Sequence, residues 1–120
     1  MSRSFFTALV VATLAGCSNT PPPPDWQMNA RGALDDFTAA YMSGNARVEA
    51  AEFTRARRAL SSTGQPEQVA RAELLRCAVQ VASLVFEPCP GFEPLRQDAP
   101  AAERAYAAYL AGQAQPQDAA

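Results

Sequence analysis

In the second half of the chain, residues 74–86 read Leu-Leu-Arg-Cys-Ala-Val-Gln-Val-Ala-Ser-Leu-Val-Phe, and the predicted fold is built around this segment. Apolar residues recur there at helical spacing, and further apolar residues lie off that stripe. A helix that is apolar on most of its sides is usually central in a fold. We therefore predict a central helix that begins at Pro66. The alternative is a strand over 79–85, which would have no partner strand. The predicted inner face comprises Ala70, Leu74, Cys77, Val81 and Leu84.

Two helical patterns precede this segment. The first runs from Asp25, a candidate N-cap, to Gly44, and the second runs from Asn45 to Gly64. Their spacing places one apolar face of each helix toward the core. These faces comprise Trp26, Ala30, Ala33, Leu34, Phe37 and Tyr41 in the first helix, and Phe53, Ala56 and Leu60 in the second.

One further helix is predicted after the central segment. Prolines and a glycine break regular structure over 87–97, and a last helix follows from Asp98 to Gly112. Its expected inner stripe comprises Ala102, Tyr106, Tyr109 and Leu110. The sequence thus predicts an all-α domain, a compact array of about four helices.

A short pattern occurs twice. Residues 39–45 and 107–113 both contain Ala-Ala-Tyr-x-x-Gly, at an offset of 68 residues. This offset is twice the period of a tetratricopeptide repeat, although the rest of that repeat's pattern is missing. The repeated pattern therefore indicates either a distant relationship to tetratricopeptide proteins or only a common ending of alanine-rich helices.

Composition narrows the possible functions. The chain has 120 residues, 48% of them hydrophobic, and a net charge of −2. Nucleic-acid binders usually carry a basic excess, so we expect no nucleic-acid partner. The sequence contains no His and no Lys, which removes the commonest general base and the commonest metal ligand. We therefore predict no enzyme, no catalytic residue, no metal site and no cofactor.

The first residues have a pattern of their own. Arg3 precedes an apolar run from Phe5 to Ala15, which leads into Leu14-Ala15-Gly16-Cys17. The run is about half the length of a membrane-spanning helix. This segment resembles the signal peptide and lipobox of bacterial lipoproteins. The alternatives are a simple membrane helix and an ordinary secreted protein.

The resemblance implies that residues 1–16 are cleaved and that Cys17 is acylated, as by palmitate. Because Ser18 is not Asp, it further implies an outer-membrane location facing the periplasm. Several acyl chains on one Cys anchor a protein stably. The expected membrane contact is therefore the covalent lipid on Cys17.

A spacer follows the expected lipid. Residues 17–25 contain four consecutive prolines, which favour the extended polyproline II conformation. The prolines could instead form a ligand for an SH3-type domain. The predicted organisation is thus a tether over 17–25, a helical domain over 26–112 and a frayed tail over 113–120.

The remaining cysteines form a candidate disulfide. In the oxidising compartment that the resemblance implies, Cys77 and Cys89 are expected to pair. A bridge would hold the proline-rich loop against the central helix. Free thiols, a redox site and a metal site are the alternatives, and a 12-residue spacing without any His favours none of them.

Candidate partner-binding residues are few. Arg55, Arg57 and Arg58 form the one basic cluster, which suits an acidic partner or a merely solvated face. Trp26 at the tether junction and Phe92 in the loop are anchor candidates if they are exposed.

These features lead to one functional expectation. We expect a non-catalytic adaptor or accessory subunit of an envelope assembly, with an envelope protein as its partner. A carrier of a small apolar ligand or lipid, and an inhibitor or immunity-type lipoprotein, are the alternatives.

Overall fold

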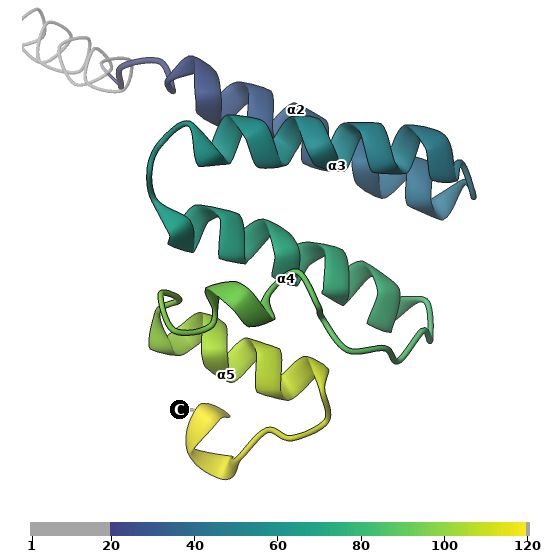
Figure 1. Ribbon diagram of the computed structural model, residues 1–120, viewed down its shortest axis with the longest axis vertical. Helices are drawn as coiled ribbons and strands as arrows, with labels where there is room; N and C mark the ends of the chain where they lie inside the picture. Colours follow the sequence, from purple (N-terminus) through teal and green to yellow (C-terminus); the bar gives the residue numbers. More distant parts are fainter. Residues whose placement is uncertain (1–19, 120) are drawn as a thin grey trace, which may run out of the picture.

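The computed structural model describes residues 20–119, and over this range the chain is all-α (Figure 1). The α-helices are α2 (Asp25–Met42), α3 (Ala46–Ser61), α4 (Pro66–Ala82) and α5 (Ala101–Leu110). Two short 3-10 helices, η2 (Glu93–Leu95) and η3 (Pro116–Ala119), follow α4 and α5 respectively. The predicted array of about four helices is confirmed. The strand alternative is wrong, because 79–82 are helical and no strand occurs within 20–119.

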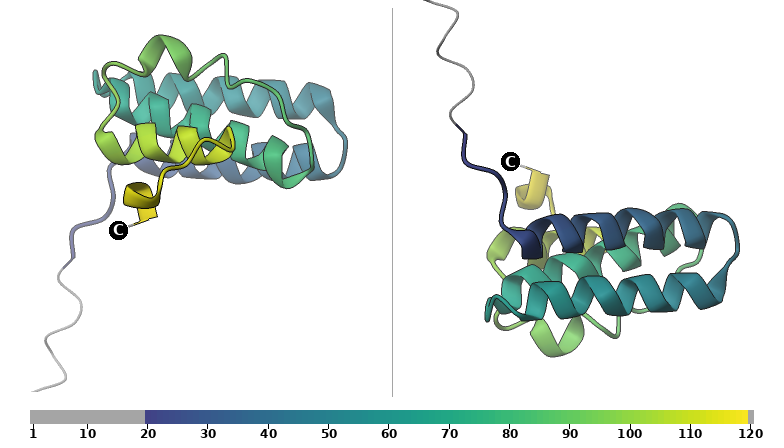
Figure 2. Two further views of the ribbon diagram at one scale, coloured as in Figure 1. Left: turned by 90° about the horizontal axis from the view of Figure 1, so that it is seen from below. Right: turned by 90° about the horizontal axis from the view of Figure 1, so that it is seen from above.

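The helices form layers around α4. Helices α2 and α3 lie side by side, α4 lies beneath them, and η2 and α5 cover its other side (Figures 1 and 2). The predicted central position of α4 is therefore confirmed. One apolar cluster lies between α4 and the α2–α3 pair, and it comprises Ala30, Phe37, Phe53, Leu60, Val69, Ala72 and Val79. A second cluster lies between α4, η2 and α5, and it comprises Ala70, Leu74, Phe92, Ala99 and Ala107.

The helix starts follow simple sequence signals. The side chain of Asn45 accepts a hydrogen bond of 3.3 Å from the Val48 N–H, as expected of an N-cap. Pro66 is the first residue of α4, a position whose N–H has no partner within the helix. The N–H that proline lacks therefore costs no hydrogen bond there. Asp25 was expected as an N-cap and the last helix was expected to start at Asp98, but the N-cap residues of these two helices are Pro24 and Pro100. Asp25 lies instead in the first turn, where its negative charge favours the positive helix end.

Three helices end in the same turn. In α2, α4 and α5, a left-handed residue donates its N–H to the carbonyl three residues earlier, and the next residue donates five residues back. The left-handed residue is Gly44 in α2 and Gly112 in α5, with φ of 72° and 70°. The repeated Ala-Ala-Tyr-x-x-Gly pattern corresponds to two of these turns. In α4 the same position is Leu84, with φ of 62°, although side chains with a Cβ rarely adopt this conformation.

The left-handed turn at Leu84 changes the predicted inner face of α4. The apolar pattern extends to residue 86, but the helix ends at Ala82. Leu84 therefore leaves the helical stripe and is 77% exposed, while the predicted inner residues Leu74 and Cys77 are buried. The expectation that Leu84 faces the core is wrong.

The predicted inner stripe of α5 is also wrong. Ala107 is the buried residue of this helix, whereas Tyr106 and Tyr109 are exposed and stack with ring centroids 6.2 Å apart. A small alanine lets α5 approach α4 closely, and the tyrosine hydroxyls stay in water. Ala102 is exposed as well, and Leu110 is partly buried.

An ion pair links α4 to α5. The sequence suggests that Arg71 pairs with Glu67 within the helix, but Arg71 donates to Glu103 of α5 instead. This hydrogen bond holds the pKa of the Glu103 carboxyl below its usual value, because the guanidinium stabilises the charged form. Glu103 is thus ionised at neutral pH and helps to hold α5 in place.

Leu84→Gly should stabilise the protein, because glycine adopts the left-handed conformation without a Cβ penalty. The exposed leucine side chain contributes little burial, so we expect a gain of about 0.5–1 kcal/mol in the free energy of unfolding. For a domain of this size, the melting temperature should rise by about 2–8 °C in thermal unfolding followed by circular dichroism.

Gly44→Leu is the matched reverse substitution, since a Cβ at Gly44 would meet no atom within 4 Å. It should lower stability by about 1–2 kcal/mol. A lower melting temperature for Leu84→Gly would instead show that the leucine packs favourably enough to outweigh its backbone strain.

Candidate functional site

The predicted arginine cluster is divided among different partners. Arg55 lies on the exposed surface between Asp36 of α2, at 3.2 Å, and Glu52 of its own helix, at 3.0 Å. Arg58 is exposed and has no ion-pair partner within 20–119. The three arginines therefore do not form one basic face, because Arg57 is engaged elsewhere.

Arg57 holds a buried carboxylate. Its Nε donates to Oε1 of Glu73 at 2.7 Å, and the Glu73 side chain is only 7% exposed. Gly91 of the loop after α4 packs against the same carboxylate, since a Cβ there would clash with Glu73 Oε2. Glu73 is thus the point where α3, α4 and the loop meet, and Arg57 has a structural role.

The two aromatic anchor candidates belong to the core. Phe92 is fully buried in the second apolar cluster, so its ring is not accessible to a partner. Trp26 is half-buried and packs against the first cluster. Phe92 is therefore not exposed, as an anchor would have to be, because the loop folds inward over α4.

The cysteine pair holds this loop. Cys77 of α4 and Cys89 lie at disulfide distance, with Cα atoms 5.6 Å apart. Cys77 is buried and Cys89 is partly buried, so the bridge lies beneath the loop surface. This geometry agrees with the predicted bridge. The predicted lipidation residue, Cys17, lies outside the described residues, as does the signal segment 1–16.

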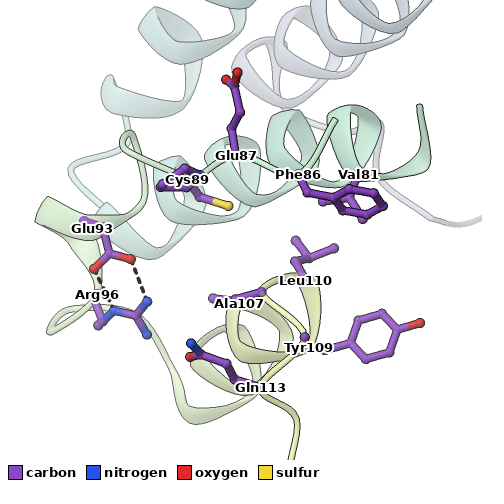
Figure 3. Close-up of a pocket in the computed structure, with 13 residues that line it drawn as sticks. Val81, Phe86, Glu87, Cys89, Glu93, Arg96, Ala107, Tyr109, Leu110 and Gln113 are labelled. Atoms are coloured by element: carbon purple, nitrogen blue, oxygen red, sulfur yellow. Dashed lines mark hydrogen bonds and ion pairs between the residues drawn. The ribbon is translucent and has the colours of Figure 1, made fainter. Parts of the chain in front are cut away.

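An open groove lies between the ends of α4 and α5, and we call it the α4–α5 groove (Figure 3). It has a volume of about 810 Å³. Val81 and Phe86 approach it from one side and Leu110 from the other, whereas Tyr109 points outward at its edge. The full lining is Val81, Phe86, Glu87, Pro88, Cys89, Glu93, Arg96, Ala107, Tyr109, Leu110, Ala111, Gly112 and Gln113.

Large apolar side chains border this groove and remain in solvent. Phe86 is 73% exposed and Tyr109 is 65% exposed, and Leu84 precedes the groove residues on the adjoining turn. A contiguous exposed apolar patch is typical of a binding site. This groove was not predicted from the sequence, because residues 84–86 were expected to continue the central helix, with Leu84 on its inner face. The signal was present in three consecutive apolar residues immediately before the prolines.

Two of the three charged side chains that line the groove, Arg96 and Glu93, form an ion pair. Arg96 donates to Glu93 through Nε at 3.0 Å and Nη2 at 2.6 Å, and its guanidinium lies 5.1 Å from the centre of the Phe92 ring. The bonds from Arg96 lower the pKa of the Glu93 carboxyl, so that carboxyl is charged at neutral pH. Glu87 adds a further negative charge and points away from Leu110 (Figure 3).

The chemistry offered by the groove is that of a binding surface. Its walls supply apolar contacts, one neutralised ion pair and one acidic side chain. Among the residues from 20 to 119, no group of three or more His, Cys, Asp or Glu side chains could hold a metal ion. Nor is any helix in this range long and apolar enough to cross a membrane.

Comparisons with protein-family models, with curated proteins and with solved structures find no match to this chain. The function must therefore be argued from the residues and geometry of the chain itself, rather than from analogy.

Removing the bridge with Cys77→Ser should destabilise the protein by about 3 kcal/mol, because the unfolded chain loses a ring of about 13 residues. Thermal unfolding should shift to lower temperature, and thiol titration should find one reactive thiol at Cys89. A reductant should lower the melting temperature of the wild type and leave that of the variant unchanged. Equal melting of both proteins would contradict a structural bridge.

Arg57→Met should lower stability by about 1–3 kcal/mol, because it leaves the Glu73 carboxylate buried without its donor. Arg58→Met is the matched control on the same helix, and its effect should stay within about 0.5 kcal/mol. Chemical denaturation of both variants tests this difference. If both variants lost the same stability, water would solvate the Glu73 carboxylate as well as Arg57 does.

Proposed function

We propose that this chain is a lipoprotein of the bacterial outer membrane that faces the periplasm. In this proposal it acts without catalysis, as a protein–protein adaptor or accessory subunit of an envelope assembly. The observation that carries the location is Leu14-Ala15-Gly16-Cys17, which follows an apolar run of signal-peptide length. The acyl chains on Cys17 would form the membrane anchor, and residues 1–16 would be removed.

The segment after Cys17 supports a tethered domain. Pro21–Pro24 are exposed, and Pro24 has φ of −63° and ψ of 152°, which are polyproline II values. A stiff spacer over 17–25 would reach about 25 Å at 3.1 Å per residue. The helical domain would then stand clear of the lipid headgroups.

The exposed apolar residues favour an adaptor over the alternatives. A carrier of a lipid or small apolar ligand encloses its cargo, whereas the α4–α5 groove is open and Phe86 and Tyr109 stand at its edge. The groove still makes a carrier the second candidate. An inhibitor would use the same surface, and it differs from an adaptor only in the nature of its partner.

Cys17→Ser should release the protein from the membrane, because no acyl chain can then be attached. We expect the wild type in the outer-membrane fraction, with incorporation of radiolabelled palmitate, and the variant without label in the soluble or unprocessed fraction. Cys77→Ser is the matched cysteine control, and it should stay acylated and membrane-bound. Palmitate on Cys17→Ser, or its stable retention as a processed membrane protein, would refute the anchor.

Ser18→Asp tests the sorting part of the proposal. It should keep the acyl chains and move the protein from the outer-membrane to the inner-membrane fraction on a density gradient. An unchanged distribution would leave the anchor intact and remove the argument for the outer membrane.

A further inference from the structure

We propose that the α4–α5 groove is the docking site for a segment of a partner protein in which an apolar side chain is flanked by Arg or Lys. This proposal rests on the proposed adaptor function and specifies its partner by chemistry. Four features of the described residues carry it: a strained turn, an apolar opening, its charge, and its position relative to the tether.

The strained turn exposes apolar side chains. The same left-handed position is glycine at the ends of α2 and α5, yet in α4 it is Leu84. This choice carries a backbone penalty and gains little burial, since Leu84 is 77% exposed. Strain that the fold itself does not need is a pointer to function. The turn leaves Leu84 and Phe86 exposed, and Phe86 lines the groove.

The groove offers a place for an apolar side chain. Val81 and Phe86 lie on one side of the opening and face Leu110 on the other side (Figure 3). Phe86 is 73% exposed, so most of its ring is available for contact. Aromatic residues beside a pocket are the usual anchors of protein interfaces.

The charge around the groove selects a basic partner. Helices α4 and α5 both end at the groove, and neither has a basic residue in its last turn. The capping turns pair three of the last four carbonyls of each helix, and the C-terminal end of a helix still carries a partial negative charge that favours cations. Arg96 is neutralised by Glu93, so Glu87 leaves the groove lining with a net negative charge, although its carboxylate points away from Leu110 (Figure 3). Arg or Lys beside the docked apolar residue would complement this rim.

The position of the groove disfavours a bilayer as its occupant. The chain enters the domain at the start of α2, and α4 and α5, whose last turns contribute Val81 and Leu110 to the groove, both end at the opposite end of the helices (Figures 1 and 2). Helix α2 has 18 residues, which is about 27 Å along its axis. A domain held at its N-terminal end therefore presents the groove away from the membrane that anchors it. A negative rim also repels anionic headgroups.

The test is photo-crosslinking in intact envelopes with Phe86→p-benzoylphenylalanine in the full-length chain. We expect one protein adduct, and mass spectrometry should place it on a segment with an apolar residue next to Arg or Lys. The same photoreactive residue at Met28, which is 54% exposed on α2, is the positional control and should not give this adduct. The adduct should weaken as the salt concentration rises.

Leu84→Gly, added to the photoreactive chain, separates binding from folding. It is expected to stabilise the fold while removing one of the exposed side chains, so the yield of the adduct should fall several-fold. An unchanged yield would overturn the role of the strained turn.

Other outcomes overturn the proposal. A lipid adduct would make the groove a membrane or carrier site, and an adduct to a second copy would make it a self-association site. An adduct to an acidic protein segment would refute the stated chemistry of the partner. Equal adduct yields at residues 28 and 86 would refute the groove as the site. Crosslinking at residue 86 does not depend on acylation, so it can fail or succeed independently of the Cys17→Ser fractionation.

Discussion

The link between Cys77 and Cys89 constrains the path of the whole second half of the chain. Because Cys89 must stay beside α4, the segment that leaves this helix has to run back along it. That return places Gly91 over the Glu73 carboxylate and buries Phe92 completely. Helix α5 then packs on the cluster that Phe92 completes. The second core thus depends on a loop, whereas the first core is built by α2, α3 and α4.

A charged group lies at the centre of this arrangement. Glu73 is buried between α3, α4 and the loop, where an isolated carboxylate would be strongly unfavourable. Its bond to Arg57 satisfies one oxygen, and the absence of a side chain at Gly91 leaves room for the other. Arg57 is half-exposed, so the pair is partly buried and adds little net stability compared with an apolar core, but packings that separate the Glu73 carboxylate from Arg57 are unfavourable. The pair therefore favours the observed contact between the loop and the two helices.

Local rules predicted the first three helices well and the last part of the chain poorly. Asn45, Pro66 and the glycines at 44 and 64 mark boundaries through backbone chemistry that acts over a few residues, so the sequence alone reveals them.

The end of α4 was missed because the apolar pattern continues past Ala82 into the exposed turn. The stripe of α5 was missed because periodicity favours large residues, while close packing selected Ala107. The burial of Phe92 depends on how the loop folds back, and no local pattern encodes that contact. The location of the protein rests on sequence pattern alone.

The opposite placement of the tether and the groove has a mechanical consequence. A pull between residue 24 and the groove acts along the helix axes, because α2 begins at one end of the molecule and α4 terminates at the other. Helices loaded in this direction must slide past one another, which disrupts many side-chain contacts at once rather than a few at a time. The loop from 77 to 89 cannot lengthen under such a load, since its ends are covalently joined. The domain is therefore expected to resist extension along the helix axes.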